Sequence, residues 1–195
     1  MSRILTIPNV ISFIRLACIP IFLYLLFGRH NRAGAAWLLG SLGATDWIDG
    51  YIARRFNQIS ELGKILDPTA DRLMFIVALG ALIINHAGPG WFYWLVLIRE
   101  FLFGGTVLIA TLAGMKRFDV TRWGKLATFL LMFAIPGLLI GSSELGLRTA
   151  FEIAAWILAV PGLIISYGTA IAYIPVVRKN LREGREERAN RAAEA

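Results

Sequence analysis

The sequence predicts an all-α integral membrane protein with six transmembrane helices and both termini in the cytoplasm. Hydrophobic residues make up 57% of the 195 residues, against roughly 45–50% in a soluble domain, and the mean hydropathy is +0.63. The apolar residues gather in segments of about 20 residues, the length that a helix needs to cross the hydrocarbon core. Basic residues collect in alternate breaks between these segments, as the positive-inside rule requires of cytoplasmic loops.

Only short breaks separate the apolar segments, so we expect one membrane domain over residues 1–177. Residues 178–195 mix basic and acidic side chains and are expected to form a polar cytoplasmic tail, a solvated or membrane-surface helix without a catalytic role. His30 and His86 are expected near helix ends at the membrane interface. The six expected membrane helices are 7–28, 33–55, 62–84, 91–113, 123–142 and 149–177.

The formal net charge is +7, and its distribution predicts the orientation. If both termini lie on one side, that side collects most of the Lys and Arg residues outside the helices, whereas the other side has Arg29, Arg32 and Arg148. The positive-inside rule then places the termini in the cytoplasm. Basic loops of this kind suit anionic lipid, so we expect no nucleic-acid partner. The predicted location is the cell (plasma or inner) membrane, crossed several times.

Four aspartates interrupt the apolar pattern of the second and third expected helices. Asp46 and Asp49 are three residues apart and Asp67 and Asp71 are four apart, so each pair lies on one helix face. At membrane depth each carboxylate would cost about 2.5–3.5 kcal/mol on insertion scales. Two divalent cations would cancel the four charges, and hard cations prefer carboxylate oxygens. We therefore predict a two-metal site near the cytoplasmic ends of both helices.

Small residues accompany the aspartates. Gly50 and Ala53 lie on or near the aspartate face of the second expected helix. Small residues there either let helices pack closely or leave room for a flat ligand, and metals nearby favour the ligand. Arg54 would then contact a phosphate.

Polar residues on three other expected helices are open to two interpretations each. On the first, Asn9 shares a face with Ser12 and Arg15, either as interfacial caps with a snorkelling arginine or as polar groups that face the metal site. On the fourth, Arg99 and Glu100 point about 100° apart and need not pair with each other; either each finds a polar partner inside the bundle, as part of a structural network, or Arg99 belongs to a substrate pocket. On the fifth, the candidates for an anion site are Gly124, Lys125 and Thr128, unless this stretch is only a positive flank.

The aspartate stretch resembles the signature of the CDP-alcohol phosphatidyltransferases, D-x2-D-G-x2-A-R-x8-G-x3-D-x3-D. The resemblance implies a homodimer of six-helix subunits that holds two Mg²⁺ or Mn²⁺ ions on the four aspartates. It also implies transfer of the phosphatidyl group of CDP-diacylglycerol to an alcohol with release of CMP. Asp71 would accept the proton of the acceptor hydroxyl, and the nucleotide would bind Gly50, Ala53, Arg54 and Gly63. The eight matching residues are Asp46, Asp49, Gly50, Ala53, Arg54, Gly63, Asp67 and Asp71.

Two branches of the family compete for the acceptor. The PNVIS start, the Arg99–Glu100 pair and the GKLAT stretch resemble enzymes that act on glycerol-3-phosphate, although Ala127 and Leu131 stand where those usually carry lysine and glutamine. The stretches NQISELGKILDPTADRL and GKLATFLLMFAIP resemble bacterial cardiolipin synthases, whose acceptor is phosphatidylglycerol. We rank glycerol-3-phosphate slightly ahead, and inositol phosphate third. The candidate acceptor-binding residues are Asn9, Arg99, Lys125 and Thr128.

An ion-coupled membrane transporter is the alternative of another class, because acidic residues inside membrane helices also mark ion pathways. Transporters of that kind usually show inverted repeats and broken helices at the membrane midplane. Here the acids gather on two successive helices near one surface. Binding of a cytidine nucleotide that depends on a divalent metal would separate the two classes.

Overall fold

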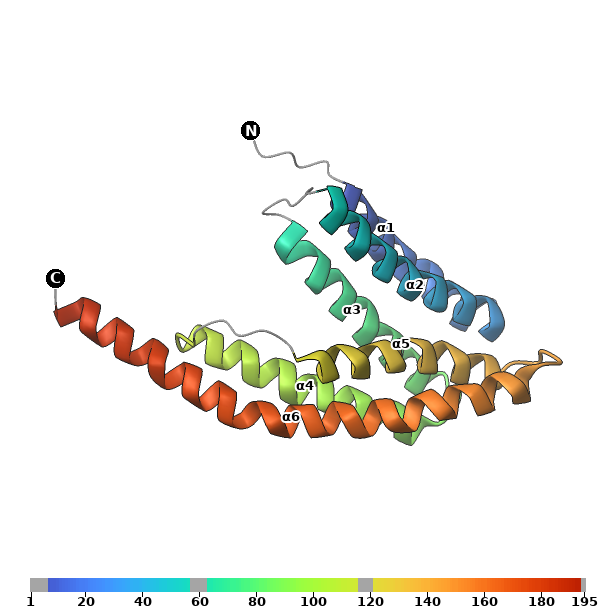
Figure 1. The fold of residues 1–195 in the computed structure, drawn as a ribbon. Helices are drawn as coiled ribbons and strands as arrows, with labels where there is room; N and C mark the ends of the chain where they lie inside the picture. The colour runs from blue at the N-terminus through green and yellow to red at the C-terminus, as the bar shows by residue number, and fades with distance from the viewer. Residues whose placement is uncertain (1–6, 57–62, 116–120, 194–195) are drawn as a thin grey trace. The chain divides into compact units, whose positions relative to one another are not determined.

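A computed structural model describes residues 7–56, 63–115 and 121–193, and the surroundings of the side chains over 10–45, 69–115, 121–184 and 186 (Figure 1). Every regular element in these residues is helical, which confirms the all-α prediction. The elements are α1 (Ile7–Leu23), η1 (Tyr24–Gly28), α2 (Arg32–Phe56), α3 (Gly63–Ile84), α4 (Gly90–Leu112), α5 (Arg122–Gly141) and α6 (Arg148–Ala193).

Except at the C-terminal end of α6, the helix ends lie close to the predicted boundaries. η1 is a π-helical continuation of α1 that carries the first segment to Gly28, where the Arg29 N–H donates to the Tyr24 carbonyl at 2.9 Å. His30 and His86 adopt left-handed backbone angles (φ 49° and 52°), each two residues after the last residue of its helix, η1 or α3. Such residues end helices because the chain must turn out of the right-handed helix there. Both histidines therefore lie at helix ends, as predicted.

Four of the helical stretches in the described residues are long and apolar enough to cross a membrane: Val10–Gly28, Gly90–Leu112, Arg122–Gly141 and Arg148–Gly184. Large apolar side chains on them are exposed, among them Leu108 and Ile109 of α4 and Ile164 and Ile171 of α6. Exposed side chains of this kind suit contact with lipid tails, because a soluble protein rarely exposes so many together. The chain is a helical membrane protein.

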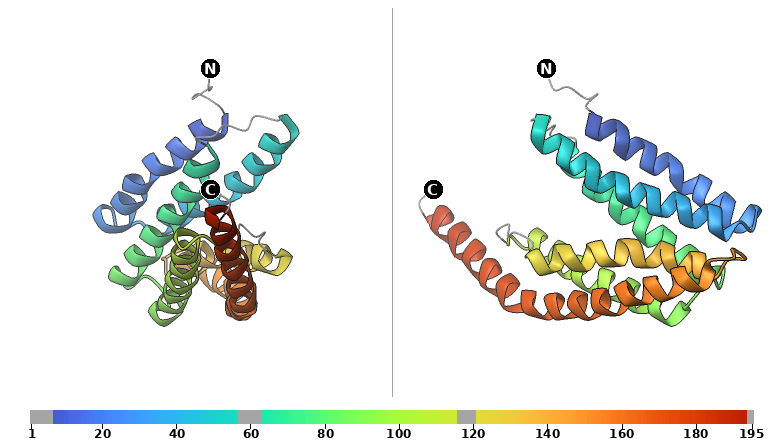
Figure 2. Two further views of the ribbon diagram at one scale, coloured as in Figure 1. Left: turned by 90° about the vertical axis from the view of Figure 1, so that its left-hand side faces the viewer. Right: turned by 45° about the vertical axis from the view of Figure 1, so that its right-hand side comes forward.

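The chain divides into two compact units. Unit 1 comprises Met1–Trp94 and Met132–Ile157, and unit 2 comprises Leu95–Leu131 and Leu158–Ala195. In unit 1, α1 packs along α3 and α2 (Figure 2).

Two glycines bring α5 and α6 close together within unit 1. A methyl group at Gly137 would come within 2.8 Å of the Ala155 Cβ, and one at Gly141 within 2.8 Å of the Glu152 Cβ. Gly137 and Gly141 are four residues apart and so share one face of α5. Membrane helices use this spacing of small residues because it lets backbones approach and gain van der Waals contact.

Unit 2 holds α4 against α6 through polar and aromatic contacts. The Tyr167 hydroxyl donates to the Leu95 carbonyl at 2.9 Å, and the rings of Phe103 and Tyr173 lie 5.2 Å apart. α6 continues without a break past residue 177 to Ala193. The described part of the tail is therefore helical.

Candidate functional site

The four aspartates lie on two continuous helices of unit 1. Asp46 and Asp49 fall in the second half of α2, and Asp67 and Asp71 fall in the first half of α3. Because both helices are unbroken at these positions, each pair occupies one helix face, as predicted. Asp71 is the member whose side chain is described. The predicted site residues that lie outside the described side chains are Asn9, Asp46, Asp49, Gly50, Ala53, Arg54, Gly63 and Asp67.

Asp71 forms an ion pair with Arg15 of α1, between the Arg15 Nη1 and the Asp71 Oδ1 atoms. The Arg15 side chain is 6% exposed, the Asp71 side chain is 38% exposed, and Ser12 is buried one turn before Arg15. Of the two interpretations of this face, the snorkelling arginine is wrong, because the guanidinium is buried against the aspartate instead of reaching water. Arg15 on the polar face of α1 therefore contacts Asp71 of α3.

The Arg15–Asp71 pair has a clear physical reason. A guanidinium is always charged in proteins, and a buried charge is tolerated only when it is paired and hydrogen-bonded. The Asp71 carboxylate provides a negative charge that pairs with this guanidinium of α1. The sequence signal was present, since Ser12 and Arg15 interrupt an apolar helix three residues apart. This pattern predicts a polar face on the helix but does not indicate which residue that face contacts.

The partial exposure of Asp71 fits a ligand for a hard cation. A carboxylate that is 38% exposed remains open to a further partner beside Arg15, and oxygen donors of this kind are those that Mg²⁺ and Mn²⁺ prefer. Among the described side chains, no group of three or more His, Cys, Asp or Glu residues gathers to hold a metal. Three of the four predicted ligands lie outside those side chains.

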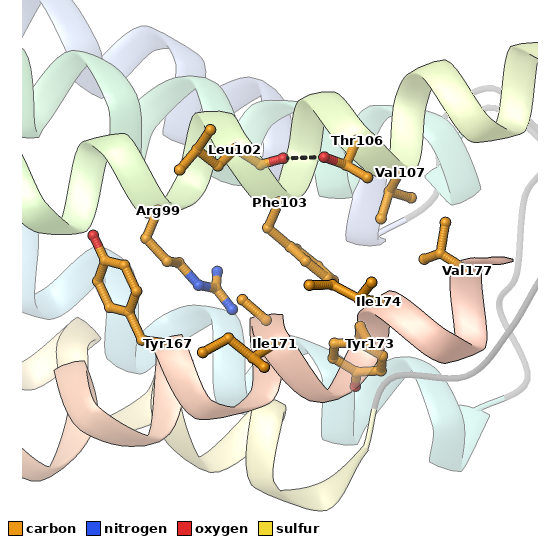
Figure 3. A pocket seen from close by; sticks show the side chains of 11 residues that line it. Arg99, Leu102, Phe103, Thr106, Val107, Tyr167, Ile171, Tyr173, Ile174 and Val177 are labelled. Atoms are coloured by element: carbon orange, nitrogen blue, oxygen red, sulfur yellow. Dashed lines mark hydrogen bonds between the residues drawn. The ribbon is translucent and has the colours of Figure 1, made fainter.

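Arg99 lines a pocket of about 220 Å³ between α4 and α6 in unit 2 (Figure 3). Its Nη1 lies 3.0 Å from the Glu100 Oε2, its Nε donates to the Ser166 carbonyl at 3.4 Å, and its guanidinium carbon lies 5.0 Å from the centre of the Phe103 ring. The expectation that Arg99 and Glu100 need not pair is corrected here. The long arginine side chain spans the 100° between neighbouring positions, and two nearly buried charges gain most by meeting.

The remainder of this pocket is largely apolar. Thr106 lines it, but its hydroxyl donates to the Leu102 carbonyl of its own helix at 2.6 Å (Figure 3). Among the described residues, Arg99, whose charge is paired with Glu100, is the one basic residue of an otherwise largely apolar lining. The remaining lining residues are Leu102, Phe103, Val107, Tyr167, Ala170, Ile171, Tyr173, Ile174 and Val177.

The start of α5 uses most of its polar groups internally. The Thr121 hydroxyl accepts from the Gly124 N–H at 3.3 Å and from the Tyr173 hydroxyl at 3.0 Å, which is the bonding of a helix N-cap. The Thr128 hydroxyl donates to the Gly124 carbonyl at 3.1 Å. Gly124 thus already has a partner for its N–H, while the Lys125 side chain is exposed.

Ala127 and Leu131, the two positions that depart from the glycerol-3-phosphate branch, are both buried in α5. Ala127 is 0% exposed and Leu131 is 4% exposed. A lysine and a glutamine are mostly exposed residues and would be costly to bury without partners. The structure around α5 is therefore built for apolar side chains at these two positions.

A model of the CDP-alcohol phosphatidyltransferase family matches residues 5–161. The chain belongs to this family. It is 37% identical over 186 residues to the CMP-forming cardiolipin synthase of Streptomyces coelicolor, covering 93% of this chain and 86% of that protein. It is 38% identical over 143 residues to a putative cardiolipin synthase of Mycobacterium tuberculosis, covering 73% and 68%. It is 34% identical over 166 residues to the CDP-diacylglycerol–glycerol-3-phosphate 3-phosphatidyltransferase of Rickettsia typhi, covering 83% and 93%.

Membership of this family makes the protein a transferase of phospholipid synthesis. The transporter alternative is wrong, because the family match covers the aspartate stretch that suggested an ion pathway. Both acceptors favoured by the sequence are represented among the named relatives.

Proposed function

We propose that this protein transfers the phosphatidyl group of CDP-diacylglycerol to phosphatidylglycerol, forming cardiolipin and CMP. The observation that carries the proposal is the similarity to a CMP-forming cardiolipin synthase over 93% of this chain. The buried, apolar Ala127 and Leu131 support it, because an acceptor with its own acyl chains needs fewer cations than a small phosphate. The proposal reverses the slight preference for glycerol-3-phosphate that the sequence suggested.

The residues of the aspartate stretch have separate roles in the proposed transfer. A hydroxyl oxygen of the acceptor glycerol forms a bond to the phosphatidyl phosphorus, while the bond from that phosphorus to the CMP phosphate oxygen breaks. Asp71 accepts the hydroxyl proton, a role that requires hydrogen-bond reach of the nucleophile. Arg15 fixes the Asp71 carboxylate through its ion pair. Arg54 binds the phosphates of the nucleotide, beside Gly50, Ala53 and Gly63.

The four aspartates suit a pair of divalent cations, Mg²⁺ or Mn²⁺. When bound, the ions would neutralise the pyrophosphate and stabilise charge that develops on the oxygens. Asp46, Asp49, Asp67 and Asp71 would hold them.

The membrane arrangement is part of the same proposal. All of α1 to α6 cross the cell membrane, including α2 and α3, whose aspartates lower their hydropathy, and the tail is a polar appendage from residue 178. Both termini and the aspartate site face the cytoplasm, because most Lys and Arg residues outside the helices fall on that side. Two subunits associate as a homodimer, in line with the family resemblance.

Glycerol-3-phosphate is the second candidate acceptor. The similarity to the Rickettsia typhi enzyme favours it, as does the exposed Lys125 at the start of α5. Purified protein with CDP-diacylglycerol and Mg²⁺ or Mn²⁺ would be given one acceptor at a time, and the lipid product identified by mass spectrometry. Cardiolipin formed from phosphatidylglycerol supports our proposal. Phosphatidylglycerophosphate formed from glycerol-3-phosphate, with no cardiolipin, would replace it by the second candidate, and turnover of inositol phosphate alone would rule out both.

A further inference from the structure

A second, polar cavity of about 960 Å³ lies in unit 1 at the helix ends remote from the aspartates. Three connections form it: the turn from η1 to α2, the turn from α3 to α4, and the turn from α5 to α6. Segments far apart in the sequence thus converge on one hollow. Its lining residues are His30, Asn31, Arg32, Ala33, Asn85, Ser142, Ser143, Glu144, Leu145 and Arg148.

The cavity gathers positive charge on a side of the protein that has little of it. Arg29, Arg32 and Arg148 are the basic residues that the charge distribution leaves on this side, and two of the three line the cavity together with His30. Glu144 contributes one carboxylate. Two guanidiniums against one carboxylate leave a net positive lining.

Arg32 is held in place within this lining. Its side chain is half-buried and its Nη1 donates to the Ser142 carbonyl at 3.0 Å, which ties the start of α2 to the α5–α6 turn. The bond uses one of the five N–H donors of the guanidinium. A fixed guanidinium loses little entropy when it binds a further anion, and its fork matches a phosphate in a bidentate fashion.

The neutral lining residues are also anchored. The Asn31 Oδ1 accepts from the Gly34 N–H at 2.8 Å, so the NH₂ group of that amide remains a donor. The Asn85 Nδ2 donates to the Leu26 carbonyl at 3.4 Å, and the Ser143 hydroxyl donates to the Ile140 carbonyl at 2.6 Å. The cavity wall is therefore formed in advance, as in most ligand sites.

Tryptophans mark this end of unit 1 as the level of lipid head groups. Trp91 and Trp156 stack with ring centres 5.6 Å apart, and Trp37 meets Phe151 edge to face at 6.0 Å. Trp37 and Trp91 lie within the first two turns of α2 and α4. Tryptophan is enriched at the membrane–water interface, where its amphipathic ring is stable.

The cavity is separate from the aspartate site. Arg32 precedes Asp46 by 14 residues along α2, and Asn85 follows Asp71 by 14 residues along α3. At a rise of 1.5 Å per residue, each interval corresponds to about 21 Å. One lipid head group cannot occupy both places.

We propose that this cavity binds the phosphate of an anionic phospholipid head group, on the face of the membrane opposite the aspartates. Arg32 and Arg148 would contact the phosphate oxygens, with Asn31 as a neutral donor. The volume is at the upper end of that of small-molecule sites, which leaves room for a whole head group. The choice of leaflet depends on the proposed orientation, whereas the binding site depends on the lining alone.

The test uses full-length protein in a neutral detergent with EDTA present, so that binding of lipid through metals on the aspartates is suppressed. The probes are phosphatidic acid, zwitterionic phosphatidylcholine and inorganic phosphate, and binding is read from the rise in unfolding temperature with ligand concentration. The variants are Arg148→Gln, Arg32→Gln and Arg32→Lys. Arg29→Gln is the matched control, because it removes an equal charge from an exposed neighbour that does not line the cavity.

We expect phosphatidic acid to stabilise the wild type and Arg29→Gln alike. Arg148→Gln and Arg32→Gln should bind it about tenfold more weakly, the loss of one charge-assisted contact, and Arg32→Lys should retain most of the affinity. All variants should release CMP at the wild-type rate in the presence of metal. The CMP assay therefore tests the proposed reaction, and the lipid-binding assay tests the cavity independently of it. Equal weakening by Arg29→Gln would overturn the site, as would equal stabilisation by phosphatidylcholine. An arginine-dependent effect of inorganic phosphate as large as that of phosphatidic acid would make it a site for free phosphate instead.

Discussion

The Arg15–Asp71 ion pair predicts a measurable coupling between α1 and α3. Measured pairs contribute about 0.2–1 kcal/mol when exposed, and breaking a buried pair costs about 3–5 kcal/mol. Arg15 is 6% exposed and Asp71 is 38% exposed, so this pair lies between the two cases. We expect a coupling free energy of about 1–3 kcal/mol.

The two single variants should differ in a definite direction. Asp71→Asn removes the carboxylate charge that faces a buried guanidinium, whereas Arg15→Gln leaves a carboxylate that is already partly exposed and can be hydrated. Removing the aspartate should therefore lower the free energy of unfolding more than removing the arginine. Arg15→Lys, which retains a cation but loses the guanidinium fork, should fall between the wild type and Arg15→Gln.

A double-mutant cycle measures the coupling directly. The wild type, Arg15→Gln, Asp71→Asn and the double variant would be unfolded by denaturant in the same detergent, without metal, and the four free energies compared. Distant sites are additive within about 0.3–0.5 kcal/mol. A coupling inside that margin, or a larger loss for Arg15→Gln than for Asp71→Asn, would refute the packing of the polar face of α1 on Asp71.

Four further outcomes are expected. Asp71→Asn should abolish CMP release while the protein still folds. Normal turnover by this variant would show that Asp71 is not the proton acceptor. Arg54→Ala should weaken the binding of CDP-diacylglycerol about 10–100-fold, which corresponds to the loss of one charge-assisted contact. Equal weakening of acceptor binding would argue against a role of Arg54 in nucleotide binding. Lys125→Ala should raise KM for the phosphate-bearing acceptor that the protein uses; an unchanged KM would exclude Lys125 from the acceptor pocket. Gly137→Val should cost about 1–3 kcal/mol by overpacking α5 against Ala155, whereas Gly80→Ala, where nothing lies within 4 Å of the added carbon, should be neutral, and equal losses would contradict the close α5–α6 packing.

The course of the helices could be predicted from the sequence because their signals are local. An apolar run of about 20 residues, ended by residues such as His30 or the turn before Gly90, defines a helix without reference to any neighbour. The aspartate pairs were placed on shared faces for the same reason, since periodicity alone determines the face.

The partners of polar residues could not be predicted in this way. Ser12 and Arg15 define a polar face, but its contact with Asp71 depends on how α1 packs on α3, a choice made by side chains 56 residues apart in sequence. The Arg99–Glu100 pair was missed because the angle between neighbouring positions says little about the reach of a flexible arginine. The capping of Gly124 by Thr121 is local and was readable, since threonine stands three residues before it.

We propose that the stretch from Asp46 to Asp71 is a metal-dependent site for phosphatidyl transfer. The most direct test is CMP release from CDP-diacylglycerol by the purified protein, with Mg²⁺ or Mn²⁺ titrated and phosphatidylglycerol and glycerol-3-phosphate as acceptors. Asp67→Asn would be compared with wild type, since Asp67 is one of the four predicted metal ligands. We predict release that requires metal and an acceptor, and that is lost in a folded Asp67→Asn variant. CMP release that persists in EDTA, or that is unchanged in the Asp67→Asn variant, would contradict a metal-dependent site on these aspartates.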